Sequence, residues 1–176
     1  MESHDEERII FKALNYGNSN GSYNIKQLEI ALERLKTLGS IYFLLPGPKM
    51  IWQFGELGYD ISINHNGRLG KKPILWNYYS NRERKNVYDA WSYLMEIRKF
   101  PIFSNPNSNI QTWLNGSVKK IHYNYEEKNA ILIANFDSKK VETNIKQSQI
   151  INCVHFNFIF NKKFTDRFCL FFSLLT

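Results

Sequence analysis

The chain has 176 residues, of which 43% are hydrophobic, 15% aromatic and 22% charged. This length fits one domain or one and a half, and the composition is that of a globular protein rather than a disordered one. No apolar run is long enough to cross a membrane, and the polar, acidic start at Met1 does not resemble a signal peptide.

The formal net charge of +7 is spread along the chain, mostly in pairs of lysines. The one denser basic cluster contains Arg82, Arg84 and Lys85, and Glu83 interrupts it. A diffuse charge favours solubility over recognition, so we expect no nucleic-acid partner. Cys153 and Cys169 form neither a metal-binding spacing nor a disulfide framework.

The first third of the chain predicts a loop over residues 15–24 and then a helix that Asn24 caps. The apolar residues at helical spacing are Ile25, Leu28, Leu32 and Leu35. The helix ends either at Gly39 or, as a buried helix, near Leu44.

A stiff Pro-Gly-Pro break at 46–48 separates this helix from an apolar run at 50–54, which predicts a short buried strand closed by Gly55. Residues 58–73 are rich in Gly and Asn, and their length makes them a candidate functional loop. Ser80 and Glu83 then form a capping box for a helix that Pro101 stops. The alternation of helix, strand, loop and helix is typical of repeated strand–helix units.

The pattern changes after Pro106. Alternating and continuous apolar segments predict antiparallel strands at 118–125 and 130–136, and a weaker one at 141–145. The tail from about residue 150 is rich in Phe and has no clear period. It is either a last hydrophobic strand pair or sequence from a shifted reading frame, and we slightly favour the second hypothesis.

Residues 2–8, Glu-Ser-His-Asp-Glu-Glu-Arg, carry the motif of greatest chemical interest. Taken alone, this segment favours a helix N-terminus with Ser3 as its cap and acidic residues in the first turn. A second segment, residues 45–58, reads Leu-Pro-Gly-Pro-Lys-Met-Ile-Trp-Gln-Phe-Gly-Glu-Leu-Gly.

Together the two segments resemble successive signatures of the α-amylase superfamily (glycoside hydrolase family 13), in the right order and about one barrel helix apart. The first resembles the Asn-His-Asp type of segment that ends the seventh barrel strand. The second resembles the Pro-Gly break that precedes the eighth strand, which closes on Gly-Glu. The resemblance covers roughly residues 1–145 and extends to bacterial α-amylases.

The resemblance implies roles for individual residues. Asp5 matches the third carboxylate of the family, which stabilises the transition state by hydrogen bonds to sugar hydroxyls. His4 matches the neighbouring histidine that donates to the same sugar. Glu56 and Tyr59 follow the eighth strand, so we expect them near the substrate face of the barrel, in structural or binding roles.

The same resemblance implies that two catalytic groups are missing. The family takes its nucleophile from an Arg-x-Asp segment and its general acid from a separate Glu, and both precede the segment with which this chain begins. No Arg-x-Asp occurs in the sequence. We therefore expect a fragment that is inactive alone, from an enzyme that acts on α-1,4-glucans such as starch and maltooligosaccharides by a retaining mechanism.

The resulting fold prediction is α/β: a partial β/α (TIM) barrel over residues 1–100, the start of an antiparallel β-sandwich domain over 101–149, and an atypical tail over 150–176. The family builds its Ca²⁺ sites from upstream loops, so no metal or other cofactor is expected here. The partners expected are an α-glucan and the missing N-terminal part of the barrel. The parent enzyme is expected to be secreted or periplasmic.

Two other functions fit the sequence. The first is a branching or transglycosylating enzyme, which uses the same carboxylates but directs a sugar hydroxyl instead of water onto the intermediate. The second is a carbohydrate-binding module without catalysis. Its stacking platforms would be Trp76, Tyr78, Tyr79 and Trp113, although Trp113 also fits a place in the core of the β domain.

Overall fold

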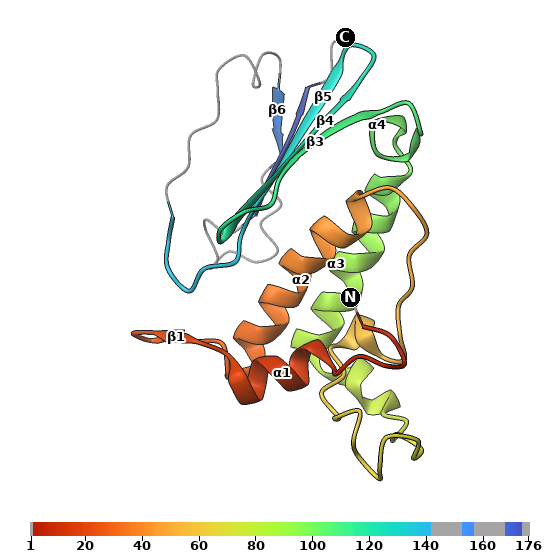
Figure 1. Cartoon of the computed structure of the whole chain (residues 1–176), viewed down its shortest axis with the longest axis vertical. Coiled ribbons are helices and arrows are strands. Elements are labelled where there is room, and N and C mark those ends of the chain that lie inside the picture. The colour runs from red at the N-terminus through yellow and green to blue at the C-terminus, as the bar shows by residue number, and fades with distance from the viewer. Residues whose placement is uncertain (1, 142–152, 157–167, 174–176) are drawn as a thin grey trace. The chain divides into compact units, whose positions relative to one another are not determined.

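The computed structural model describes residues 2–141, 153–156 and 168–173 (Figure 1). The chain divides into two compact units. The first comprises Met1–Phe43 and Gly47–Leu94, and the second comprises Leu44–Pro46 and Met95–Thr176. Within the described residues, no helix has the length and apolar character that a membrane span requires.

The first unit is helical. It contains α1 (Ile9–Tyr16) and the greater parts of α2 (Leu28–Leu44) and α3 (Arg82–Arg98). Two strands, β1 (Ser19–Asn20) and β2 (Tyr23–Asn24), pair as a small antiparallel hairpin between α1 and α2. The 3-10 helices η1 (Gly55–Leu57) and η2 (Trp76–Ser80) interrupt the long connection to α3.

The longer of the two predicted forms of α2 is correct, because the helix continues through Gly39 to Leu44. Asn24 does not cap it: the Asn24 side chain accepts a hydrogen bond from Lys26 N (3.0 Å) before the helix begins. Gly39 lies where Trp91 of α3 meets α2. A Cβ at this position would be 2.2 Å from Trp91 Nε1. The glycine therefore permits the contact between the two helices, which lie side by side in Figure 1.

The strand predicted at residues 50–54 is wrong. This segment turns, and Gly55 N donates to Trp52 O (2.7 Å) just before η1. Phe54 adopts a left-handed conformation with φ of 55°. A strand needs a partner with which to pair, whereas this run turns so that Phe54 is buried in a cluster with Leu57 and Tyr59, while Met50 stays exposed.

Helix α3 begins one residue later than the predicted capping box requires. Asn81 accepts a hydrogen bond from Arg84 N (3.0 Å) and acts as the cap, whereas Ser80 ends η2. One side of the helix is buried at Val87, Trp91 and Leu94. The helix ends at Arg98, and Pro101 opens the short helix α4 (Pro101–Ser104).

The second unit is an antiparallel sheet with the strand order β3-β4-β5-β7-β6. The strands predicted at 118–125 and 130–136 are confirmed as β4 (Val118–Tyr125) and β5 (Lys128–Asn135). Strand β3 (Asn109–Trp113) was not predicted. Of the strand expected at 141–145, all but the first residue lies outside the described part of the chain.

The tail contributes β6 (Cys153–Phe156) and β7 (Phe168–Ser173), which pair with each other. This is the arrangement of the first hypothesis, a last hydrophobic strand pair. Each strand pairing in the described residues is antiparallel. The molecule thus has the mixed helix-and-sheet class that was predicted, while its partial barrel and sandwich remain predictions.

Candidate functional site

The motif at residues 2–8 is an irregular approach to α1 with bends at residues 4–6, and not the first turn of a helix. The helix begins at Ile9, so the alternative with Ser3 as its cap is wrong. Ile9 N donates instead to Glu2 Oε1 (2.7 Å), and Arg8 N donates to Glu7 Oε1 (2.8 Å). Carboxylates therefore accept hydrogen bonds from the backbone N–H groups of the N-cap residue Arg8 and of Ile9, the first residue of the helix.

His4 and Asp5 lie together on the surface. His4 Nε2 is 2.9 Å from Asp5 Oδ2, and their side chains are 69% and 63% exposed. Arg68, from the loop after the second motif, donates one Nη2 to both Asp5 O (3.0 Å) and Asp5 Oδ1 (3.1 Å). The predicted carboxylate is thus solvent-facing and is held at Oδ1 by a guanidinium that also binds the Asp5 backbone carbonyl.

Arg8 joins the first motif to the second. It is buried, and its Nη1 donates to Ser3 O (2.9 Å). Its guanidinium carbon lies 6.0 Å from the ring centre of Trp52 and 5.9 Å from that of Tyr59. Such cation–π contacts anchor the backbone that carries His4 and Asp5 on the residues of the second motif.

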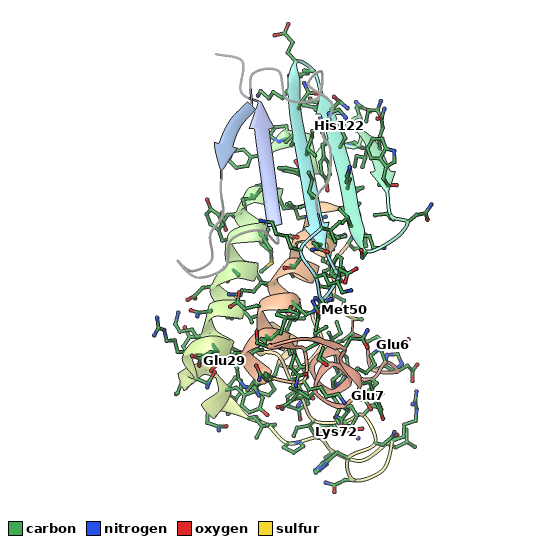
Figure 2. The ribbon with its side chains drawn as sticks, turned by 90° about the vertical axis from the view of Figure 1, so that its left-hand side faces the viewer. Glu6, Glu7, Glu29, Met50, Lys72 and His122 are labelled. Atoms are coloured by element: carbon green, nitrogen blue, oxygen red, sulfur yellow. The ribbon has the colours of Figure 1, made fainter. Side chains whose placement is uncertain are left out.

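Glu7 makes the other connection between the motif and the loop (Figure 2). Its carboxylate accepts hydrogen bonds from the Ser62 hydroxyl (2.7 Å) and from Ile63 N (2.9 Å). Burial tends to raise the pKa of Glu7, but the hydrogen bonds from Ile63, Ser62 and Arg8 outweigh it and lower that pKa below 4.5. The role of Glu7 could not be predicted from the sequence, because nothing near it in the chain indicates a partner 55 residues away.

Glu2 is a buried acid with one free oxygen. It is 5% exposed, and Oε2 has no hydrogen-bond partner among the described residues. Burial raises the pKa of this carboxyl, against the lowering effects of the Ile9 hydrogen bond and the Arg8 charge. A Cβ at Gly55 would lie 3.3 Å from Oε2, so the glycine leaves room for the acid.

The two other predicted site residues differ in their exposure. Glu56 lies in η1 and is partly exposed. Tyr59 is fully buried, and its hydroxyl donates to Pro73 O (2.6 Å). Tyr59 therefore packs in the core of the first unit, and a binding role for either residue stays a prediction.

A buried ion pair between Arg84 and Asp60 connects α3 to the segment that follows η1. Arg84 Nη2 is 2.9 Å from Asp60 Oδ2, and Arg84 Nη1 donates to Leu57 O (3.0 Å) and to Gly58 O. The guanidinium also covers the Tyr78 ring at 3.7 Å, and the Tyr78 hydroxyl donates to Asp60. Arg84 thus belongs to the interior and not to a basic surface, and Tyr78 is engaged in this network.

The remaining proposed stacking residues lie on the surface. Trp76 is 75% exposed, and Tyr79 and Trp113 are each 47% exposed. Trp113 is therefore not the core residue of the β domain that the alternative interpretation required. In the part of the chain that the structure describes, no group of three or more His, Cys, Asp and Glu side chains could hold a metal ion.

The sequence and the fold of the chain were compared with those of known proteins. No protein-family model and no curated protein matches the sequence. Two solved structures do match its fold. A mutant of Bacillus licheniformis trehalose-6-phosphate hydrolase in complex with PNG has a TM-score of 0.64 and 17% identity, covering 98% of this chain and 42% of that one. Eubacterium rectale Amy13B has a TM-score of 0.58 and 15% identity, covering 98% and 38%.

The chain spans less than half the length of the solved structures that it matches. At this level of identity the likeness concerns the fold. It supports, at the level of the fold, the resemblance to α-amylase-type enzymes that the two motifs predicted.

Proposed function

We propose that this chain is the C-terminal part of an α-amylase-type glycoside hydrolase that acts on α-1,4-glucans by a retaining mechanism. The fold likeness to two glycosidase structures supports the class of protein. The motif order supports the position of the chain within such an enzyme. The linkage, the retaining mechanism and the α-glucan substrate are parts of the proposal.

The observation that carries the proposal is the bonding between the first motif and the loop that follows the second motif. Asp5 of the first motif is bound by Arg68. Arg68 lies ten residues after Gly58, the last residue of the second motif. Glu7 is bound by Ser62 and Ile63 of the same loop. The first segment is therefore joined to the loop that follows the second segment by direct contacts around the proposed functional carboxylate, and Arg8 contacts Trp52 of the second segment itself.

In this proposal Asp5 accepts hydrogen bonds from sugar hydroxyls beside the bond that breaks. Such contacts accelerate the reaction only if they strengthen as the ring approaches an oxocarbenium ion. The Arg68 contact keeps Asp5 in place and leaves the carboxylate accessible on its exposed side. His4, beside it, donates to the same sugar.

Asp5 alone cannot cleave a glycosidic bond. A retaining enzyme needs a nucleophile and a general acid with their carboxyl groups about 5 Å apart. The family's nucleophile segment, Arg-x-Asp, does not occur in this sequence. We therefore propose that residues 1–176 are inactive alone, and that the complete enzyme requires upstream strands as its partner.

The direct test is a titration of ¹⁵N,¹³C-labelled residues 1–176 with maltoheptaose, followed by NMR, with a parallel assay for reducing sugar released from amylose. We expect saturable shifts at His4 and Asp5 that Asp5→Asn reduces, and no release of sugar. Hydrolysis that Asp5→Asn abolishes would contradict the inactive-fragment proposal. Absence of any shift at His4 and Asp5 would contradict their role in sugar binding.

A carbohydrate-binding module is the second candidate, and the exposed rings of Trp76, Tyr79 and Trp113 favour it. The same titration separates the two functions. A module would shift the indole signals of Trp76 or Trp113 and leave Asp5 unchanged. A branching or transfer enzyme would share the Asp5 response and would differ only once the upstream catalytic groups were restored.

A further inference from the structure

The loop that carries Arg68 is organised around an ammonium group. Lys72 Nζ lies within hydrogen-bond distance of four backbone carbonyl oxygens: those of His65 (2.9 Å), Gly67 (2.8 Å), Arg68 (3.3 Å) and Gly70 (2.8 Å). An ammonium has three donors, so the longest contact, to Arg68 O, shares a proton with one of the others.

The side chains of residues 64–69 are exposed, so apolar burial contributes little to the shape of this loop. Its backbone closes on itself by the hydrogen bonds Gly67 N to Asn64 O (2.9 Å) and Gly70 N to Gly67 O (3.0 Å). At Gly70, a Cβ would be 1.9 Å from Asn66 O. The turn is therefore tight enough to bring its carbonyls around one point.

Four carbonyl dipoles that converge with their negative ends inward repel one another unless a cation lies between them. Lys72 supplies that charge from within the chain, as a compact ion with rotatable donors that a planar guanidinium could not replace. Its ammonium therefore stabilises the one loop conformation in which the carbonyls meet.

The position of Lys72 also affects Asp5, through Arg68. Lys72 binds the carbonyl of Arg68 itself, and the Arg68 side chain holds both the backbone and the carboxylate of Asp5. Glu7 fixes the start of the same loop at Ser62 and Ile63. Figure 2 labels Glu7 and Lys72 at the same end of the first unit.

We infer that Lys72 is a positioning residue: its ammonium, surrounded by the carbonyls of residues 65–70, holds Arg68 where it orients Asp5 for sugar binding. The inference rests on the proposed function only for the role of Asp5. The structural link from Lys72 through Arg68 to Asp5 is testable without any sugar.

The test uses Lys72→Ala in the full chain, with chemical rescue. This substitution removes three carbons and the nitrogen, the atoms that n-propylammonium returns. We expect the Arg68 guanidinium and Asp5 backbone signals to move, and exchange of the Gly70 N–H to accelerate by about tenfold or more. Added n-propylammonium should restore both, whereas n-propanol, which lacks the charge, should not. Lys71→Ala, at the exposed neighbouring lysine, should change neither.

The indole signal of Trp91, which donates to Leu35 O (3.3 Å) within the helical core, reports whether the unit remains folded. If that signal is lost together with the loop signals and n-propylammonium does not restore them, Lys72 supports the whole unit and the inference is wrong. Unchanged Arg68 and Asp5 signals in Lys72→Ala would also overturn it.

A second arm concerns the sugar. In Lys72→Ala, the apparent Kd of maltoheptaose at Asp5 should rise by about tenfold and recover with n-propylammonium. An unchanged Kd would refute a positioning role in binding. If the unsubstituted chain shows no maltoheptaose response, the proposed function fails while the loop result stands, so the two failures are distinguishable.

Discussion

At the scale of single residues, two buried tyrosines differ in what their hydroxyls do. Tyr59 and Tyr123 are both fully buried. The Tyr59 hydroxyl donates to Pro73 O (2.6 Å), whereas the Tyr123 hydroxyl finds no hydrogen-bond partner among the described residues. A satisfied buried hydroxyl stabilises a fold, and an unsatisfied one costs desolvation free energy.

This difference predicts opposite effects of the same substitution. Tyr59→Phe should lower the free energy of unfolding of the first unit by about 1 kcal/mol. Tyr123→Phe should leave that of the second unit unchanged or raise it by up to about 1 kcal/mol. Urea unfolding followed through amide signals of α2 and β4 measures each unit separately. A clear loss of stability in Tyr123→Phe would show that its hydroxyl has a partner.

Glu7 predicts a pH-dependent effect. Because its pKa lies below 4.5 in the folded chain, its ionised form contributes stability above that pH, and the contribution disappears as the pH falls through the folded pKa. Glu7→Gln should therefore cost about 1–2 kcal/mol of unfolding free energy at pH 7 and much less at pH 3. Urea unfolding at the two pH values checks this. The exposed neighbour Glu6 provides the control Glu6→Gln, and an equal, pH-independent loss in both variants would contradict the account.

At the scale of elements, α2 and α3 are held together by a ring packed on a glycine. Trp91 is buried, donates to Leu35 O and contacts the Phe43 ring edge-on at a centroid distance of 5.1 Å. Gly39 provides the space for this contact. Glycine has a poor helix propensity, but the packing of Trp91 that Gly39 permits stabilises the unit by more than this propensity costs.

Gly39→Ala should accordingly destabilise the first unit by about 1–3 kcal/mol, despite the better helix propensity of alanine. In a Trp91→Leu background the clash is absent, so the same substitution should be neutral or stabilising by up to about 1 kcal/mol. A double-mutant cycle measured by urea unfolding gives the coupling. Equal effects of Gly39→Ala in the two backgrounds would show that Trp91 does not set the cost.

Elements with strong local periodicity could be predicted from sequence, and those set by distant contacts could not. Helix α2 and strands β4 and β5 follow from their apolar patterns. Residues 50–54 do not, because an apolar run indicates burial and leaves open whether a strand or a turn achieves it. The outcome was a left-handed Phe54 ahead of η1.

The same limit applies to the candidate site. His4 and Asp5 were identified from a motif whose residues are neighbours in the chain. Arg68 and Lys72 were not, because they belong to a loop without periodicity and act through contacts such as the one between Arg68 and Asp5, 63 residues apart. Backbone carbonyls, which surround Lys72, carry no sequence signal at all.

At the scale of the whole molecule, a helical unit that bears the candidate site is followed by an antiparallel sheet. The fold likeness extends over 98% of the chain and over less than half of each matched structure. In the function that we propose, this chain contributes one carboxylate of a catalytic set, Arg68 and Lys72 support that carboxylate, and the other members lie upstream.

The DNA sequence upstream of the Met1 codon tests this central claim most directly. We expect upstream codons to encode an Arg-x-Asp segment and then a separate catalytic Glu, in the order that places both before Asp5. A promoter and translation start directly before the Met1 codon, with neither segment encoded upstream in any frame, would contradict it.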